Sequence, residues 1–353
     1  MKVLVTGAAG FIGFHLSRAL AGRGDEVVGI DSINDYYDPA LKRARLADLG
    51  IGGRAADSGR LVESATLPRV TFRRLLLEDR EGIDRFFSAH KFDRVCHLAA
   101  QAGVRYSLEN PRAYIEANVV GFLNVLEGCR TTGVGHLVFA SSSSVYGLSQ
   151  RTPFSEHAGT DHPVSIYAAS KKADEMLAHA YAHLFGIPCT GLRFFTVYGP
   201  WGRPDMAYYK FAQAIVEGKN IELYNSGKMT RDFTYVDDVV EGMMRVTDRP
   251  AASDPRWDPE HPDPAVSSAP FRIYNIGNSR AEPLAALVTA LERQLGRKAE
   301  LRMGPMQPGD VRATEADVSD LKRDFGWMPT TSLEDGIARF VKWFKSYREG
   351  TNP

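Results

Sequence analysis

The stretch T-G-A-A-G-F-I-G, from Thr6 to Gly13, directly follows an apolar run that begins at Val3. Its glycines allow a strand to turn sharply into a helix, because glycine lacks a Cβ and tolerates positive φ. Such a turn brings backbone N–H groups close to a pyrophosphate and packs the helix tightly on the strand. A glycine-rich turn without any ligand is the alternative, since the spacing is not G-x-G-x-x-G.

A second apolar run supports a ligand at this turn. It extends from Glu26 to Ile30 and ends in Asp31, close to the roughly 20-residue spacing expected for the acid that binds the adenosine ribose. A carboxylate there accepts a hydrogen bond from a free 2′-hydroxyl and repels a 2′-phosphate. The sequence therefore predicts a dinucleotide cofactor and favours NAD over NADP.

A second motif, S-I-Y-A-A-S-K, places Lys171 four residues after Tyr167. Residues four apart are neighbours on a helix, and an ammonium group stabilises a phenolate, so the pair predicts a proton-handling site. Taken alone, such a pair usually means only an amphipathic helix. Here an apolar run from Val138 leads into serines at 141–144. Loops at the carboxyl ends of strands bind ligands in open α/β sheets, where a serine can hydrogen-bond the oxygen that the tyrosine deprotonates.

The order of patterns predicts an α/β fold. Apolar runs alternate with helical patterns up to about residue 195, which indicates a Rossmann-type doubly wound parallel sheet with a smaller C-terminal α/β substrate-binding lobe. We expect a cofactor domain at 1–198, with some later segments returning to it, and a substrate lobe mainly at 199–353. The expected strands are Lys2–Thr6, Glu26–Asp31, Val70–Leu75, Arg94–Leu98, His136–Ala140 and Cys189–Arg193, and the expected later helices include Tyr208–Glu217 and Leu284–Leu295. We expect an exposed insertion at Gly50–Pro68 and a long surface loop at Arg249–Pro270.

Composition and charge are those of a globular protein. Of 353 residues, 44% are hydrophobic and 24% charged, and 43 basic residues balance 43 acidic ones, so neither nucleic acid nor an anionic membrane is an expected partner. No signal peptide and no membrane-spanning run of roughly 20 apolar residues is expected. Cys96, Cys129 and Cys189 read as buried thiols in a reducing, cytoplasmic compartment, with no metal site and no disulfide framework.

At this point the chain resembles the extended short-chain dehydrogenase/reductase family over nearly its whole length. Besides the motifs above, it carries H-L-A-A at His97, N-V-V-G at Asn118, R-F-F-T-V-Y-G-P at Arg193 and R-D-F-T-Y-V-D-D at Arg231. Within that family it looks most like the UDP-glucuronate 4-epimerases. The motifs that carry this second likeness are I-N-D-Y-Y-D at Ile33, Q-A-G-V-R-Y-S at Gln101, G-P-W-G-R-P-D-M-A at Gly199 and M-Q-P-G-D-V at Met306.

The resemblance implies a tightly held NAD, a UDP-sugar substrate and a homodimer formed through helices near Arg112–Arg130 and Tyr167–Phe185. It implies that Tyr167 takes the proton of the sugar 4-hydroxyl, that Ser142 binds the same oxygen, and that Lys171 also touches the nicotinamide ribose. The remaining cofactor residues would be Gly7, Gly10, Phe11, Ile12, Gly13, Asp31, Leu77, Leu98, Ala99, Ala100 and Asn118. Further substrate residues would be Ser143, Ser144, Arg105, Thr196, Arg203 and Arg231.

Some of these residues have simpler interpretations. Arg203 is otherwise a surface arginine in a Pro/Gly loop, and Arg231 otherwise forms a salt bridge to Asp232 or Asp237. We interpret His97 as a packed structural residue, and Asn118 as a residue that fixes backbone geometry near the site.

The serine segment separates the reaction types within the family. By the family resemblance, the related 4,6-dehydratases have an Asp-Glu pair at the positions of Ser143 and Ser144. The UDP-glucuronate decarboxylases have a glutamate at the position of Ser144. A 4-keto uronic acid loses carbon dioxide readily, so an epimerase has to hold the carboxylate in a poor orientation for cleavage. Short hydroxyl donors suit that task.

The chain also departs from the family pattern, and alternatives stay open. Leu76 stands where relatives often carry aspartate, Arg312 and Glu315 replace proline and tyrosine, and Met306-Gln307 stands where UDP-glucose epimerases present arginines to the diphosphate. The alternatives are a 4-epimerase of a neutral UDP-hexose or UDP-N-acetylhexosamine, a UDP-glucuronate decarboxylase, an ordinary alcohol dehydrogenase, and a non-catalytic NAD-sensing protein.

Overall fold

A computed structural model describes residues 1–306 and 311–350. The chain divides into two compact units, which are described separately below. The first contains Met1–Ser149, Glu156–Arg193 and Val240–Tyr274, and the second contains Gln150–Ser155, Phe194–Val239 and Asn275–Pro353. The functional domain limits at 1–198 and 199–353 stay a prediction. Gln307, which the sequence reading compares with a diphosphate-binding arginine, lies outside the described residues.

The first unit is organised by a doubly wound sheet, which confirms the predicted fold class. Within the described residues the strand order is β11-β7-β6-β5-β1-β2-β4-β3. The chain runs from β1 outward through β2 and β4, then returns to the other side of β1 for β5, β6 and β7. The pairs β1–β2, β1–β5, β2–β4 and β5–β6 are parallel, and the short β3 is antiparallel to its neighbour β4. The bounds are β1 Lys2–Thr6, β2 Glu26–Asp31, β3 Val62–Glu63, β4 Val70–Arg74, β5 Arg94–His97, β6 Leu137–Ser142, β7 Cys189–Phe194 and β11 Phe271–Ile276.

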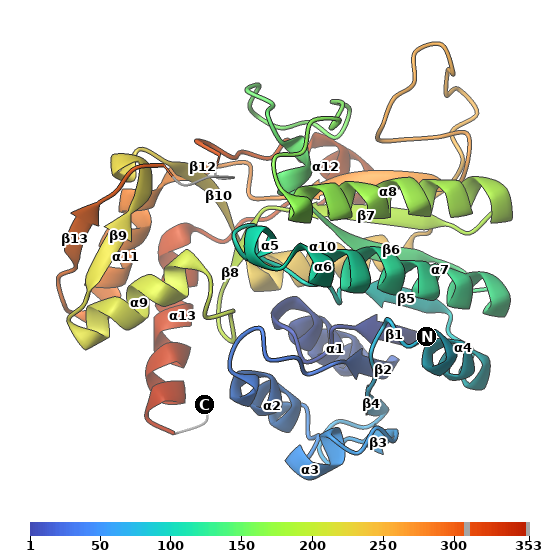
Figure 1. The fold of residues 1–353 in the computed structure, drawn as a ribbon, viewed down its shortest axis with the longest axis horizontal. Helices are drawn as coiled ribbons and strands as arrows, with labels where there is room; N and C mark the ends of the chain where they lie inside the picture. The colour runs from blue at the N-terminus through green and yellow to red at the C-terminus, as the bar shows by residue number, and fades with distance from the viewer. Residues whose placement is uncertain (307–310, 351–353) are drawn as a thin grey trace. The chain divides into compact units, whose positions relative to one another are not determined.

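Helices cover both faces of this sheet. On one face α4 (Arg80–Ala89), α7 (Gly121–Thr132) and α8 (Ile166–Phe185) pack over the strands, as Figure 1 shows. Val95 of β5 belongs to that apolar cluster, whereas the next residue, Cys96, points to the other face, where its thiol lies 3.4 Å from the Thr247 hydroxyl of α10 (Val236–Asp248). This alternation is what a strand buried on both sides requires.

The other helices of this unit are shorter or irregular. They include α1 (Phe11–Arg23) and α2 (Pro39–Asp48), followed by α3, α5, α6 and a π-helix, η1. Their bounds are Gly53–Ala56 for α3, Tyr106–Glu109 for α5, Pro111–Tyr114 for α6 and Ile115–Val120 for η1. All three cysteines are buried and free, as predicted.

The prediction for Gly50–Pro68 is confirmed in that most of its described side chains are exposed or partly exposed. The structure adds that Ile51 is buried and that Val62 pairs with Phe72 at the edge of the sheet. A two-residue strand is too short to show an alternating pattern, so the sequence gives no sign of it. The prediction for Arg249–Pro270 is confirmed in that α10 ends at Asp248 and β11 begins at Phe271, with no helix or strand described between them.

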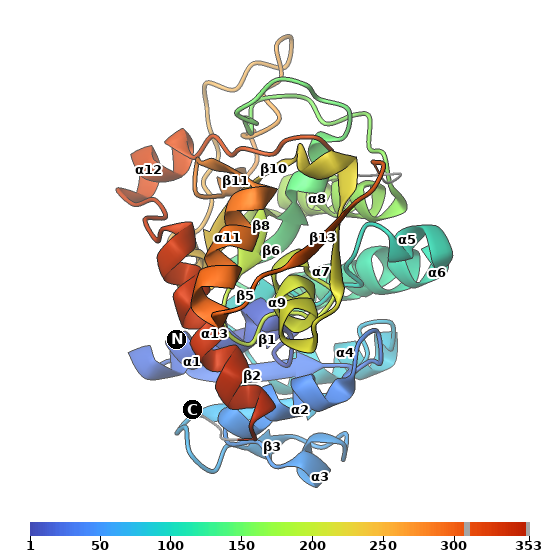
Figure 2. The ribbon, with the colours of Figure 1, turned by 90° about the vertical axis from the view of Figure 1, so that its left-hand side faces the viewer.

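The second unit is a smaller α/β assembly. Strand β10 (Thr230–Tyr235) pairs in parallel with β8 (Thr196–Tyr198) and antiparallel with β12 (Ala281–Pro283), and β9 (Asn220–Leu223) pairs in parallel with β13 (Glu300–Met303). Helix α9 (Ala207–Glu217) packs on β9 and on α11 (Leu284–Leu295), and α11 packs on α13 (Leu333–Arg348); Figure 2 shows α9 and α11 near β13. Helix α12 spans Ser319–Phe325. No helix in the described part of the chain combines the length and apolar character needed to cross a membrane.

Candidate functional site

The turn after β1 can only be built from glycine. Gly7 has φ +73, and a Cβ on it would lie 2.8 Å from the Ala99 backbone nitrogen. A Cβ on Gly13 would lie 2.1 Å from the Gly7 carbonyl oxygen, which also accepts a 2.8 Å hydrogen bond from the Gly10 nitrogen. Helix α1 therefore starts directly under the turn, with its first backbone N–H groups uncovered by any side chain of the cap residue Gly10. This arrangement suits a pyrophosphate.

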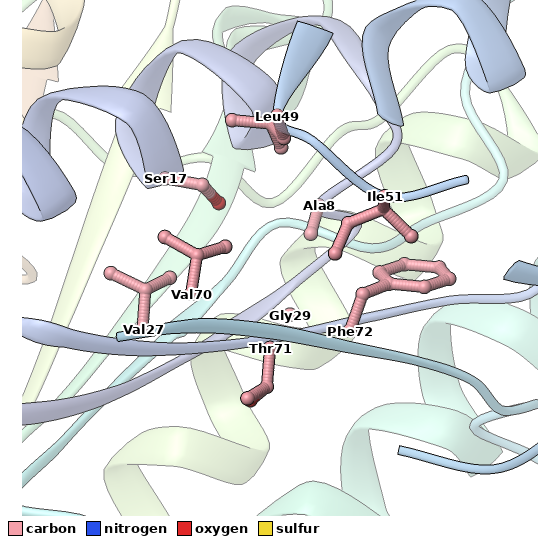
Figure 3. Close-up of a pocket in the computed structure, with 9 residues that line it drawn as sticks. All are labelled: Ala8, Ser17, Val27, Gly29, Leu49, Ile51, Val70, Thr71 and Phe72. Atoms are coloured by element: carbon pink, nitrogen blue, oxygen red, sulfur yellow. The ribbon is translucent and has the colours of Figure 1, made fainter. Parts of the chain in front are cut away.

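Strand β2 leaves room for the turn because it has a glycine, Gly29, opposite Ala8. Figure 3 shows Ala8 beside Gly29 of β2, and a Cβ on Gly29 would lie only 2.7 Å from the Ala8 Cβ. The gap that Ala8, Ile51, Phe72 and their neighbours line in this view is a packing defect too small to admit a water molecule. This gap cannot hold a dinucleotide, so the predicted cofactor site is the open side of the turn.

Replacing Gly13 by alanine is expected to destabilise the protein by about 1–3 kcal/mol, because the new methyl group overlaps backbone that cannot move freely. It should also remove the bound dinucleotide, since the overlap displaces the turn. Thermal unfolding and the NAD content of the purified protein measure the two effects. The matched control is Gly22→Ala on the same helix, where a Cβ meets nothing within 4 Å. Equal losses in both variants would contradict the steric explanation.

Asp31 is the last residue of β2 and contacts the glycine turn. Its carboxylate accepts hydrogen bonds from the Ala9 nitrogen at 3.2 Å and the Ile33 nitrogen at 2.8 Å, and Lys42 Nζ lies 3.9 Å away. A carboxylate has about four acceptor positions, so it can still accept from a ribose hydroxyl. These contacts leave the carboxylate able to take the predicted role.

Thr6 and His97 fix the loop opposite the turn. The Thr6 hydroxyl accepts from the Leu98 and Ala99 nitrogens, both at 3.1 Å, so its own proton goes to His97 Nδ1 at 2.9 Å. That assigns the ring proton to Nε2. Burial, with a smaller contribution from the charge of Lys171, lowers the pKa of His97 to about 3, so the imidazole stays neutral. His97 has the packed structural environment that the sequence indicated.

Asn118 connects this loop to the helix that carries Tyr167 and Lys171. Its side chain accepts from the Gln101 nitrogen at 2.7 Å and donates to the Gln101 carbonyl at 3.1 Å and to the Ser170 hydroxyl at 2.9 Å. Asn118 is completely buried within η1, and Ser170 directly precedes Lys171. Asn118 therefore fixes backbone geometry.

Tyr167 and Lys171 lie on successive turns at the start of α8. The helix begins where the Ser165 hydroxyl accepts from the Ala168 nitrogen, which puts Tyr167 in the first turn. The Tyr167 ring is half-buried, 6.0 Å from the Tyr114 ring. Lys171 is almost fully buried and donates to Asp174 Oδ2 at 2.9 Å. Asp174 was not singled out from the sequence.

The predicted serines follow β6 in the same unit. Ser142 ends the strand, is 7% exposed and accepts from the Ser144 nitrogen at 3.1 Å. Ser143 and Ser144 begin a 3-10 helix, η2 (Ser143–Tyr146), and both are partly exposed. Strand β6 and helix α8 are packing neighbours.

A buried ion pair holds these elements together, and sequence reasoning missed it. Glu175 of α8 receives two hydrogen bonds from Arg193 of β7, at 2.8 and 2.9 Å, and one from the Ser141 hydroxyl at 2.6 Å. Burial opposes the charge on Glu175, but Arg193 outweighs it and keeps the pKa of this carboxyl below its usual range. The Arg193 guanidinium also lies 4.9 Å from the Tyr146 ring centre. The only sequence sign was the position of Arg193 at the start of a family motif.

The predicted substrate residues divide between the units. Ser142, Ser143, Ser144 and Arg105 belong to the first unit, and Thr196, Arg203 and Arg231 belong to the second. Arg105 is exposed at the start of α5, and Thr196 begins β8. Leu76 is 55% exposed, and Leu77 is buried with its carbonyl accepting from Asn124 at 2.7 Å.

The two arginines of the second unit are both held by their surroundings. Arg203 forms a two-pronged ion pair with Asp205, at 3.0 and 2.7 Å. Arg231 Nη1 donates to the carbonyls of Thr230, at 2.9 Å, and Arg312, at 3.3 Å. The Asp232 carboxylate accepts instead from the backbone nitrogens of Asn278 and Ala316.

Fold and site together define a dinucleotide-dependent α/β protein with a Tyr-Lys pair. Residues 3–277 match the NAD dependent epimerase/dehydratase family, and the chain belongs to that family. One relative is Protein CapI of Staphylococcus aureus, which is 48% identical over 98% of this chain and 99% of its own length. Another is a probable UDP-glucuronate 4-epimerase of Rhizobium meliloti (strain 1021), which is 45% identical over 99% of this chain and 98% of its own length. A Bacillus cereus UDP-glucuronic acid 4-epimerase, solved with UDP-glucuronic acid and NAD, superposes with a TM-score of 0.84 at 30% identity, covering 98% of this chain and all of that one.

Proposed function

We propose that this protein is an NAD-dependent UDP-glucuronate 4-epimerase, which interconverts UDP-glucuronate and UDP-galacturonate. The observation that carries the proposal is that one unit contains all three predicted parts of the site. The glycine turn follows β1, Ser142 ends β6 of the same sheet, and Tyr167 and Lys171 lie on α8, which packs against β6. Relatives that carry this name, 45–46% identical over 99% of this chain, support the same activity.

The residues that would hold the cofactor fit it. The turn has no room for a Cβ at Gly7 or Gly13, its helix N-terminus is open, and Asp31 keeps acceptor capacity for a ribose hydroxyl. Leu98, Ala99 and Ala100 form the facing loop, and its shape is set by Thr6. When bound, NAD supplies a reversible hydride acceptor for C4 of the sugar.

The chain's own residues handle the proton. Tyr167 takes the proton of the 4-hydroxyl, Ser142 hydrogen-bonds the reacting oxygen, and the buried Lys171 ammonium stabilises the phenolate. After the 4-keto sugar has rotated in the site to present its other face, Tyr167 returns the proton to the oxygen on C4. Proton and hydride are both restored, so the reaction is an isomerisation without net oxidation.

The serine segment favours epimerisation over the other reactions of the family. At the positions where an acid or base would be needed for dehydration or decarboxylation, the chain has Ser143 and Ser144. Their hydroxyls are neutral donors for a sugar carboxylate. The observation that favours a neutral UDP-hexose instead is the pairing of Arg203 with Asp205, because that arginine already faces a carboxylate of the protein.

Because the proposal places Arg203 on the sugar carboxylate, replacing Arg203 by alanine is expected to raise KM for UDP-glucuronate roughly tenfold or more, the effect of losing a charged hydrogen bond of about 1.5–3 kcal/mol. Turnover of UDP-glucose, where measurable, should not change. Arg256→Ala serves as the control, because this arginine is 88% exposed and pairs only locally with Asp254. Equal effects on both sugars would show that Arg203 does not read the carboxylate.

The test of the function is to incubate the purified protein with UDP-glucuronate, with and without added NAD, and to follow the sugar by proton NMR. UDP-galacturonate formed without added NAD and without carbon dioxide is the expected result. A UDP-pentose product would indicate decarboxylation, and release of free NADH would indicate an ordinary dehydrogenase. If the acidic sugar is left unchanged, neutral UDP-sugars are the next substrates.

We also propose a cytoplasmic homodimer. Exposed apolar side chains gather on neighbouring elements of the first unit, with Ile115 49% exposed on η1, Leu123 39% on α7, and Met176 52% and Leu184 68% on α8. A patch of this kind is typical of an interface between copies. Free buried cysteines suit a reducing compartment. Light scattering of the wild-type protein and of Met176→Lys tests the dimer.

A further inference from the structure

We propose that Asp174 is a positioning residue for Lys171, and that its charge limits how strongly the Lys171 ammonium stabilises the Tyr167 phenolate. The inference deepens the proposed function, and it rests on Tyr167 and Lys171 acting as the proton-handling pair. It concerns a carboxylate that neither the glycine turn nor the serine segment explains.

The first observation is the contact itself. Lys171 Nζ and Asp174 Oδ2 are 2.9 Å apart, and the two side chains are only 2% and 1% exposed. The residues are three apart on α8, which places them on neighbouring turns of one helix face. A buried pair with this separation is screened little by solvent, so each charge strongly affects the other and nearby groups.

The second observation is that Asp174 is poorly satisfied apart from this contact. Its other oxygen, Oδ1, is buried and has no hydrogen-bond partner among the described residues. Glu175, the next residue, shows the opposite pattern, since its two oxygens accept from Arg193, Ser141 and Lys172. Glu175 thus links three elements of the fold, whereas Asp174 accepts a side-chain hydrogen bond from Lys171 and its other oxygen has no partner among the described residues.

An incompletely bonded buried carboxylate costs stability. Burial raises the pKa of Asp174 to about 6, although Lys171 acts in the opposite direction. A residue kept for stability alone would be expected to use both oxygens. The contact with Lys171 is therefore the reason for an aspartate at this position.

Two other titratable groups interact with this pair: Glu175 with Asp174, and His97 with Lys171. Glu175 is balanced by Arg193 and Lys172, and His97 is neutral. Asp174 therefore offsets part of the ammonium charge, and one of its oxygens fixes where that ammonium sits.

Two variants separate position from charge. Asp174→Asn keeps the size of the side chain and an acceptor for Lys171 but removes the negative charge, whereas Asp174→Ala removes both. Asp84→Asn is the control for a change of one unit in net charge, because Asp84 is 49% exposed on α4 and outside the catalytic and binding machinery.

The first readout does not depend on epimerase activity. An ultraviolet difference titration of each variant against the same variant carrying Tyr167→Phe reports the pH at which Tyr167 ionises. In Asp174→Asn we expect this pH to fall by roughly half a unit, less than the 1–3 units typical of charges in direct contact. Asp84→Asn should leave it unchanged. An unchanged titration in Asp174→Asn would overturn the proposal.

The second readout is the pH profile of turnover for UDP-glucuronate. In Asp174→Asn the acidic limb of kcat should move to lower pH with KM unchanged, and in Asp174→Ala kcat should fall about tenfold with NAD retained, because the ammonium loses its position. Lower thermal stability with both titrations unmoved would show a purely structural role. If wild-type protein does not convert UDP-glucuronate, the proposed function fails while the difference titration still decides the role of Asp174.

Discussion

Tyr167→Phe is expected to slow conversion of UDP-glucuronate by roughly 10²–10⁴-fold, the usual contribution of a positioned general base. The substitution removes only the phenolic oxygen, so the proton of the 4-hydroxyl loses its acceptor and hydride transfer from C4 becomes slow. The ring remains, and with it the edge contact to Tyr114 at a centroid distance of 6.0 Å. Fold, thermal stability and bound NAD should therefore be unchanged.

The measurement is the initial rate of UDP-galacturonate formation, with the NAD content of each preparation determined after denaturation. Tyr181→Phe is the matched control, because Tyr181 lies on the same helix and donates to Glu127 without contact to the predicted site. A Tyr167→Phe enzyme within tenfold of wild type would require another proton acceptor. Loss of NAD from this variant would instead indicate that the phenol holds the cofactor.

Glu175→Ala is expected to lower the free energy of unfolding by about 3–5 kcal/mol, the cost of leaving one member of a buried ion pair without its partner. Arg193 would keep its charge in a fully buried position after losing two hydrogen bonds, and Ser141 would lose its acceptor. Because these residues connect β6, α8 and β7, the loss should affect the elements that carry Ser142 and Lys171.

Denaturant unfolding measures this effect, and Glu241→Ala provides the control. Glu241 pairs with Arg245 on the surface of α10 at 2.7 Å, and exposed pairs of this kind contribute about 0.3–0.5 kcal/mol. The pH dependence gives a second test. Since the folded pKa of Glu175 lies below its ordinary value, its stabilisation is present above an unfolded pKa of about 4.3 and is lost as pH falls through the folded value. Glu175→Ala should lack this part of the acid dependence, and a similar loss in Glu241→Ala would contradict the assignment.

The features that were predictable from the sequence are local ones. The glycine turn, the strands β1 and β2, and the helix that carries Tyr167 and Lys171 each follow from spacing within a few residues, because backbone sterics and helical or strand periodicity act at that range. The doubly wound fold follows from the order of these patterns. The family motifs named the candidate site residues, including Arg203, which lie far apart in the sequence.

Other features required the tertiary structure. The Ser141–Glu175–Arg193 contacts and the hydrogen bonds from Asn118 to Gln101 and Ser170 join residues from different elements, and no local pattern encodes such partners. The short strand β3 forms because β4 offers it an edge.

Burial, too, was decided by the fold. Lys171 and Asp174 are adjacent on any helix, but only packing against the rest of the first unit removes them from water and makes their charges matter to each other. The sequence by itself thus determined the fold class, the cofactor turn and the Tyr-Lys pair through short-range sterics. The tertiary structure alone decided which charged groups are buried and what they contact, because burial depends on residues that are distant along the chain.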